Sequence, residues 1–178
     1  PLVGQTIPDL PLEIFHQEKI KKINLAQYRG NWLILFFYPA DFTFVCPTEL
    51  AELAQNYDTF KKLKAEIISV SNDTAFVNQA WHQASPLIKP IQFPMAADPA
   101  GHLSKALGVY RAETGLALRA TFLIDPDGVI KAMEMHDNHL GRSVTELLRK
   151  LQAAIFLREN KGQLCPASWQ PGSPAIIL

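Results

Sequence analysis

The sequence of 178 residues contains only two cysteines, far apart and without a C-x-x-C spacing. A small secreted domain held together by disulfides would carry several closely spaced cysteines. The common zinc patterns C-x-x-C and H-E-x-x-H are missing as well, so we expect no metal site. A low cysteine count fits a reducing environment, where a lone reactive cysteine tends to indicate catalysis.

The sequence also lacks an excess of charge of one sign and has no long apolar run. The 17 Lys and Arg residues balance the 17 Asp and Glu residues, so no broad electrostatic field attracts nucleic acid or an anionic membrane. No apolar run approaches the roughly 18 residues of a membrane helix. The N-terminus lacks the basic segment and apolar stretch of a secretory signal. We therefore expect a cytoplasmic protein with neither a nucleic-acid nor a membrane partner.

Strand-like and helix-like stretches alternate along the chain. The apolar run from Trp32 to Tyr38 has the length and continuity of a central strand covered on both faces. The turn at 126–128 (Pro-Asp-Gly) predicts an antiparallel hairpin. The other predicted strands are 66–71, 94–97, 120–125 and 129–134, and the predicted helices are 50–63, 73–84 and 101–107. This alternation predicts an α/β domain in which helices cover both faces of a mixed central sheet.

The last helix has the clearest start signal. Ser143 and Glu146 have the spacing of a capping box, and apolar residues then follow at helical spacing. After Asn160 the chain becomes rich in Pro and Gly and loses the helical pattern. We therefore predict one domain over residues 1–160 and a C-terminal tail over residues 161–178, which carries Cys165.

Cys46 lies between the central strand and the following helix. Pro47 suits the first helical position, which places Cys46 at or beside the N-cap. Unpaired backbone N–H groups and the positive end of the helix dipole would then face the sulfur, a setting that lowers the pKa of a thiol. This pattern alone also fits a small buried residue at a helix start.

Activation of the thiol would not be sufficient for fast chemistry. A free thiol with a pKa of about 8.5 is roughly 3% ionised at pH 7, so complete ionisation gains only about 30-fold. A large acceleration needs groups that stabilise charge on a leaving oxygen. Thr43, three residues before Cys46, and an arginine are the natural candidates.

Residues 36–49 (FFYPADFTFVCPTE) resemble the active-site motif P-x-x-x-T-x-x-C of the peroxiredoxins, with Pro39, Thr43 and Cys46 at its fixed positions. The resemblance extends from about residue 3 to residue 172. The segments 73–82, 115–128, 140–150 and 164–169 carry the rest of it. The chain is most similar to the typical two-cysteine class, which includes the bacterial alkyl hydroperoxide reductase peroxidase subunit and thioredoxin peroxidases. The resemblance implies a thioredoxin-like fold.

The same resemblance implies roles for five residues. Cys46 would be the peroxidatic nucleophile, and Cys165 of a partner subunit would close an intersubunit disulfide with it. Thr43 and Arg119 would hydrogen-bond the peroxide oxygens. Pro39 would shield the sulfur from water. Without the resemblance, a surface residue on a strand is the more common reading of Arg119.

Three further residues are expected around these. Glu49 and Arg142 would orient the active-site arginine, and Trp81 would pack near the site. From the residues alone, Glu49 is also a first-turn carboxylate that favours the helix dipole, and Trp81 is also a core residue. For Glu49 and for Trp81 both readings stay open.

The resemblance also implies substrates and partners. Hydrogen peroxide and organic hydroperoxides would be reduced, and a thioredoxin-like protein or a flavin-dependent disulfide reductase would recycle the enzyme. The chain would form a homodimer and a ring of five dimers, and it would need no metal or organic cofactor. Two other functions remain open: a Cys–His hydrolase, and a holdase or redox-signalling adaptor. A general disulfide oxidoreductase is disfavoured because C-x-x-C is missing.

One departure from the family concerns overoxidation. Sensitive relatives carry a Gly-Gly-x-Gly motif and a C-terminal Tyr-Phe pair, whereas residues 85–93 contain no glycine and no Tyr-Phe pair follows Cys165. We expect the enzyme to resist overoxidation, because its site can open and form the disulfide before a second peroxide arrives.

Overall fold

A computed structural model describes residues 2–178. Contacts within the chain divide it into two compact units, Pro1–Arg142 and Ser143–Leu178. This division lies before the last helix, whereas the predicted boundary between the domain and its C-terminal tail follows Asn160. That boundary stays a prediction. Over the described residues, no helix is long and apolar enough to cross a membrane.

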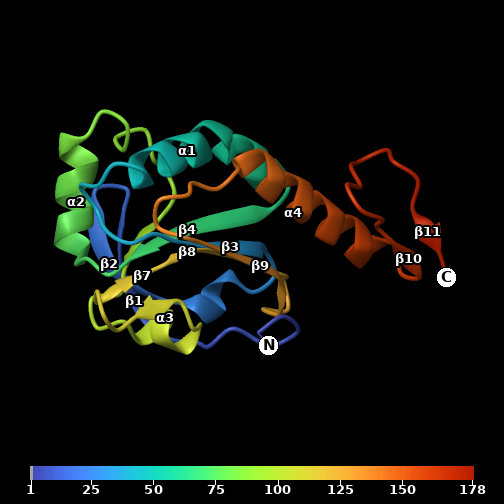
Figure 1. Ribbon diagram of the computed structural model, residues 1–178, viewed down its shortest axis with the longest axis horizontal. Helices are drawn as coiled ribbons and strands as arrows, with labels where there is room; N and C mark the ends of the chain where they lie inside the picture. The colour runs from blue at the N-terminus through green and yellow to red at the C-terminus, as the bar shows by residue number, and fades with distance from the viewer. Residues whose placement is uncertain (1) are drawn as a thin grey trace. The chain divides into compact units, whose positions relative to one another are not determined.

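The first unit is built on a seven-stranded sheet with the order β2-β1-β5-β4-β3-β8-β9 (Figure 1). Strands β3, β4 and β5 run parallel, and the remaining pairs are antiparallel, so the sheet is mixed as predicted. The strands are β1 (Pro11–His16), β2 (Lys19–Asn24), β3 (Trp32–Phe37), β4 (Ala65–Ser71), β5 (Met95–Ala97), β8 (Arg119–Ile124) and β9 (Ile130–His136).

Helices lie on both faces of this sheet, which confirms the predicted α/β architecture. Figure 1 shows α1 and α3 on opposite sides of it, and α1 contacts β4 while α2 contacts β1 and β5. The helices and short elements are η1 (Leu25–Tyr28), α1 (Cys46–Lys62), α2 (Ala75–Ala84), α3 (His102–Ala106), β6 (Tyr110–Arg111) and β7 (Leu116–Ala117).

The central strand β3 is buried at every residue, as its continuous apolar sequence predicted. Leu33, Leu35 and Phe37 pack in one core cluster with Leu103 and Leu107 from α3 and its end. The alternate residues of β3 point to the opposite face, which α1 covers. Burying each large apolar side chain contributes about 1.5–3 kcal/mol, so β3 is a stable platform for the loop that follows it.

The sheet topology brings distant segments to one end of β3. The antiparallel pairing of β3 with β8 sets Phe37 opposite Ala120, so Arg119 lies beside the point where the chain leaves β3. The next pairing sets Arg119 opposite His136 at the end of β9. The chain that leaves β9 therefore starts from the same end of the sheet before it reaches Arg142.

The second unit contains α4 (Val144–Glu159) and the paired strands β10 (Gln163–Leu164) and β11 (Ile176–Ile177). Ser143 caps α4, because its hydroxyl accepts a hydrogen bond from the Glu146 N–H at 3.2 Å. The Glu146 carboxylate accepts two hydrogen bonds from Arg149, both at 2.7 Å. The predicted cap is thus confirmed for Ser143, while the Glu146 side chain pairs along the helix.

Candidate active site

Cys46 is the first residue of α1, and 0% of its surface is exposed. The helix begins four residues before the predicted range 50–63, with Val45 as the N-cap and Pro47 in the second position rather than the expected first. Val45 already has right-handed helical angles, φ −83° and ψ −38°, so the helical backbone extends to the residue before Cys46. The N-terminal end of α1, with its partial positive charge, therefore lies at the sulfur.

Arg119 contacts this sulfur directly. Its Nη1 lies 3.3 Å from Cys46 Sγ and also donates to Glu49 Oε2 at 2.8 Å. Its Nε donates to the Asn138 carbonyl at 2.9 Å. Only 3% of Arg119 is exposed, so the guanidinium is fixed in place away from water. Over residues 2–178, no histidine hydrogen-bonds Cys46, so the arrangement that a Cys–His hydrolase needs is not present in this part of the chain.

Glu49 joins two arginines in one buried network. Arg142 donates two side-chain hydrogen bonds to the Glu49 carboxylate, from Nε to Oε1 and from Nη2 to Oε2, both at 2.9 Å. Its backbone N–H donates a third to Oε1 at 2.8 Å. Arg142 also donates to the Ala120 carbonyl, and its guanidinium lies 3.4 Å from the centre of the Phe36 ring. These contacts leave Glu49 little freedom to move.

The charges of this network do not cancel beside Cys46. Burial alone would raise the pKa of Glu49, but hydrogen bonds and charge from Arg142, together with the charge of Arg119, hold that pKa below its ordinary value. Burial lowers the pKa of Arg142, and Glu49 opposes this shift. Two guanidiniums and one carboxylate leave one positive charge in excess, and the Arg119 guanidinium lies against the Cys46 sulfur.

Pro39 and Thr43 lie in the loop between β3 and α1. Pro39 is buried and Thr43 is half-buried. The Thr43 hydroxyl donates to the Ala40 carbonyl at 3.0 Å, which fixes its position three residues before Cys46. Because this bond uses its only proton, the hydroxyl oxygen keeps lone pairs that can accept a hydrogen bond.

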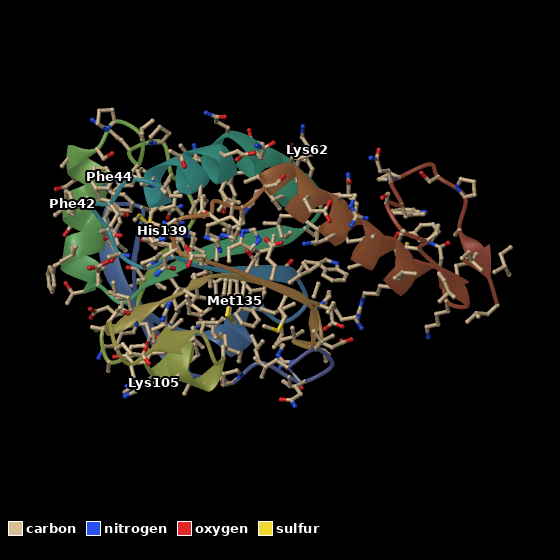
Figure 2. All side chains as sticks on the ribbon, viewed as in Figure 1. Phe42, Phe44, Lys62, Lys105, Met135 and His139 are labelled. Carbon is tan, nitrogen blue, oxygen red and sulfur yellow. The ribbon has the colours of Figure 1, made fainter. Side chains whose placement is uncertain are left out.

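Trp81 packs against this loop from α2. It is 3% exposed, and its ring centre lies 6.1 Å from that of Tyr38 and 6.0 Å from that of Phe42. Phe42 and Phe44 project from the loop and are 59% and 95% exposed (Figure 2). Trp81 thus makes the packing contact expected of it with the residues that precede Cys46.

Cys165 belongs to the second unit and lies just after β10. It is a half-buried free thiol whose Sγ lies 3.9 Å from the Ala153 carbonyl. Burial raises the pKa of this thiol, and the charge of Arg149 opposes the shift. Nearby, the Trp169 ring stacks on Phe156 at 4.7 Å, and Arg149 donates to the Trp169 carbonyl at 3.0 Å.

Sequence reasoning missed two groups at the Cys46 end of the sheet. The Tyr38 hydroxyl donates to Asp41 at 2.7 Å, inside the loop that leads to Cys46. The Asn138 carbonyl orients Arg119. A buried aspartate looks like any loop aspartate in the sequence, and a backbone carbonyl leaves no residue-type signal.

A cavity of about 700 Å³ lies elsewhere, at the C-terminal half of α1 beside β1. Tyr57, Lys61, Phe15 and His16 are among the residues that line it, and no predicted site residue does. A peroxide group consists of two oxygen atoms, so it needs positioned donors more than volume. The network around Cys46 therefore marks the site better than the cavity does. Within residues 2–178, no cluster of three or more His, Cys, Asp or Glu residues could hold a metal ion.

Comparison with known proteins gives consistent matches over nearly the whole chain. Residues 3–133 match the model of the AhpC/TSA family. Alkyl hydroperoxide reductase C of Amphibacillus xylanus is 43% identical over 176 residues, which cover 98% of this chain and 94% of that protein. The protein of the same name from Pseudomonas aeruginosa is 41% identical over 175 residues, with 98% and 94% covered.

Solved structures match equally well. Enterococcus faecalis AhpC superposes with a TM-score of 0.90 at 40% identity, covering 93% of this chain and 99% of that one. The reduced 2-Cys peroxiredoxin of Plasmodium vivax has a TM-score of 0.92 at 32% identity, covering 98% and 92%.

Proposed function

The chain belongs to the AhpC/TSA family, and we propose that Cys46 is the residue with which it attacks peroxides. It is a peroxiredoxin, an enzyme that reduces peroxides through a cysteine thiol. Its mixed sheet with helices on both faces is the thioredoxin-like fold that the sequence predicted. The assignment of particular residues to the steps of this reaction is our proposal.

One observation carries the proposal for Cys46: a fixed guanidinium donor lies 3.3 Å from a fully buried sulfur. Among residues 2–178, no cation makes a comparable hydrogen bond to Cys165 Sγ, which lies 3.9 Å from a backbone carbonyl. The site that can stabilise negative charge before and during attack is therefore the one at Cys46.

The first step is a two-electron oxidation of the sulfur. The Cys46 thiolate attacks one peroxide oxygen, an S–O bond forms, and the O–O bond breaks. The other oxygen leaves as hydroxide or alkoxide, which takes a proton and departs as water or alcohol. Cys46 becomes a sulfenic acid.

Most of the acceleration has to come from stabilising the leaving oxygen, because ionisation of the thiol supplies only about 30-fold. We propose that the Arg119 guanidinium and the Thr43 hydroxyl hydrogen-bond the peroxide oxygens. Pro39 would shield the sulfur and the sulfenic acid from water. The Thr43–Ala40 bond supports its role, since it holds the hydroxyl oxygen in a defined place.

We propose supporting roles for three residues. Glu49 orients Arg119, and Arg142 in turn fixes Glu49 through bidentate hydrogen bonds. Trp81 packs against the loop and limits its movement. These residues act through others and need not touch the substrate.

The second step would join two chains. We propose that the Cys165 thiol of a second copy attacks the Cys46 sulfenic acid, so that an S–S bond forms and water leaves. A dithiol protein, either thioredoxin-like or a flavin-dependent disulfide reductase, would then reduce the disulfide. We also propose a homodimer that assembles into a ring of five dimers, and a cytoplasmic location, which fits the low cysteine count.

Titration of the reduced protein with peroxide tests this assignment. The products are resolved on a non-reducing gel for the wild type and for the Cys46→Ser and Cys165→Ser variants. One equivalent of peroxide should convert the wild type to a covalent dimer, and neither variant should form it.

Other outcomes would overturn specific parts. If the thiols survive equimolar peroxide for minutes, Cys46 is not activated. If the wild type forms only a disulfide within one chain, the intersubunit step is wrong. A mixture of the two variants should again form a dimer, because each supplies the cysteine that the other lacks.

A further inference from the structure

Asp41 holds the loop that joins β3 to α1, residues 38–45 (the Cys46 loop), through hydrogen bonds. This residue is 6% exposed. Its Oδ1 accepts a hydrogen bond from the Tyr38 hydroxyl at 2.7 Å, and its backbone N–H donates to Asp73 Oδ2 at 2.8 Å. One residue thus ties the loop both to the end of β3 and to the segment before α2.

The hydrogen bonding of this carboxyl group is incomplete. Its second oxygen, Oδ2, is buried without a hydrogen-bond partner among the residues that the structure describes. An ionised carboxylate is costly in such a place, so burial favours the protonated form of the group. The titratable groups that act on Asp41 are Tyr38, from the end of β3, and Asp73, from the segment before α2.

The neighbouring residue shows that the closed loop is under strain. Phe42 has φ 55°, in the left-handed region that disfavours residues other than glycine. Its ring is held by the contact with Trp81, yet 59% of the residue is exposed. Stored strain of this kind favours opening when one of the hydrogen bonds that hold the loop is weakened.

We propose that Asp41 is a positioning residue: while it carries a proton it holds the Cys46 loop closed, and when it ionises the loop opens. This inference rests on the proposed function, in which Cys46 reacts with a cysteine of another chain. A sulfur that is 0% exposed cannot come within the roughly 2.0 Å of a disulfide bond unless the loop moves. Asp41 would set how often that movement happens at a given pH.

The direction of the pH effect follows from the surroundings of the carboxyl. Burial, aided by the charge of Asp73 and opposed by the Tyr38 hydrogen bond, raises the pKa of Asp41 to about 7 in the closed loop. In an open, hydrated loop its pKa would return to about 3.9. Between these values the closed loop keeps a proton that the open loop releases, so raising the pH favours opening. Above pH 7 both forms are ionised, and the dependence ends.

Hydrogen exchange of the reduced protein, without peroxide, measures this directly. After correction for intrinsic exchange rates, the opening constant of the amides in residues 40–45 should rise by up to about tenfold per pH unit from pH 5 to pH 7 and then level off. The variant Asp41→Asn, whose side chain cannot ionise, should show a flat profile. A flat wild-type profile, or an undiminished slope in Asp41→Asn, would overturn the proposal.

Two neighbours supply a matched test that does not depend on the folding of Asp41→Asn. Tyr38→Phe removes the hydrogen bond that lowers the Asp41 pKa, so the midpoint of the profile should move to higher pH. Asp73→Asn removes the repelling charge but keeps an oxygen to accept the Asp41 N–H, so the midpoint should move to lower pH. A purely structural role would not shift the two midpoints in opposite directions, and midpoints that coincide would refute the titration of Asp41.

This experiment fails independently of the proposed function. If peroxide gives the covalent dimer while the exchange profile is flat, only the role of Asp41 is lost. If the exchange profile behaves as expected but Cys46 does not react with peroxide, the role of Asp41 in loop opening is supported and the proposed function is wrong.

Discussion

The surroundings of Cys46 and of Cys165 differ in almost every physical respect. Cys46 is fully buried, with an arginine nitrogen 3.3 Å from its sulfur and a carboxylate that fixes the arginine. Cys165 is half-buried, and its sulfur lies 3.9 Å from a backbone carbonyl. Burial raises the pKa of the Cys165 thiol, and the charge of Arg149 opposes this shift.

This difference shows what each step demands of a thiol. Stabilising a transition state requires donors that are in place before the reaction, and burying them is worthwhile because a low-dielectric site strengthens them. The cost is the desolvation of three charges, which only a tightly paired network can offset. In the proposed second step, a thiol that meets a sulfur of another chain needs access instead. If this contrast holds, variants in the first region should have large effects and variants in the second region small ones.

The largest effect is expected for Glu49→Gln, because it leaves Arg119 and Arg142 buried without their anion. Breaking a buried pair in this way typically costs about 3–5 kcal/mol, so the free energy of unfolding at pH 7 should fall by about that amount. The lowered pKa of Glu49 means that its contribution is present above its ordinary pKa of 4.5 and is lost as the pH falls further. Urea unfolding at pH 7 and at pH 3.5 should therefore show a smaller difference between the variant and the wild type in acid.

Glu66→Gln provides the matched control for that measurement. Glu66 pairs with Lys61 at 2.8 Å, but the two side chains are 26% and 49% exposed. Partly exposed pairs contribute about 0–1 kcal/mol. If Glu49→Gln costs no more than this control, the buried network is not the source of stability that its geometry indicates.

Arg119→Lys should produce the next largest effect, and on rate rather than on stability. A lysine keeps the charge but cannot donate at once to the sulfur, to Glu49 and to the Asn138 carbonyl. Losing one fixed donor to a developing negative charge costs about 100-fold or more, so the rate constant of Cys46 oxidation should fall by that factor. Stopped-flow measurement with a limiting amount of peroxide gives this constant.

The corresponding control for Arg119→Lys is Arg111→Lys, which changes an arginine whose side chain is 49% exposed. It should leave the rate of Cys46 oxidation unchanged. A loss of less than threefold in Arg119→Lys would mean that charge alone matters and that the fork geometry of the guanidinium does not.

The parts of the fold that the sequence predicted are those in which local and global preferences agree. The apolar run of β3 and the turn before β9 are examples, and Gly128 takes the φ of 77° that the turn requires. The hairpin between β1 and β2 went unpredicted because Gln17 and Glu18 take φ values of 51° and 59° without a glycine or asparagine to signal them. The predicted start of α2 at Asp73 was wrong by two residues, since Thr74 is the N-cap and the Asp73 carboxylate binds the Asp41 N–H.

The residues of the candidate site also fall into those that the sequence predicted and those that it did not. Resemblance pointed to Cys46, Arg119, Glu49 and Arg142, and the structure brings these four into one network. Neither motif nor spacing could predict Asp41, because the burial that makes it unusual is a property of the folded loop. Contacts that depend on where separate segments meet remain invisible until the sheet assembles them.

The smallest expected effect concerns the second unit and tests the other side of the comparison. Trp169 is 3% exposed and its ring stacks on Phe156 at 4.7 Å, so Trp169→Leu would keep apolar bulk and lose the aromatic pair. Such a pair contributes about 0.5–1.5 kcal/mol, so the ratio of ordered to disordered tail should fall by about 2- to 12-fold. Disulfide formation should slow by up to this factor, while oxidation of Cys46 to the sulfenic acid should keep its rate.

Rapid mixing with peroxide, followed by quenching and a non-reducing gel, separates these two steps in Trp169→Leu. Ile177→Ala is the control, because it alters a tail residue that is 80% exposed and should change neither step. Faster disulfide formation in Trp169→Leu would mean that the aromatic pair holds Cys165 back rather than presenting it. A slower first step would mean that the tail also shapes the surroundings of Cys46, and the contrast between the surroundings of the two cysteines would then have to be given up.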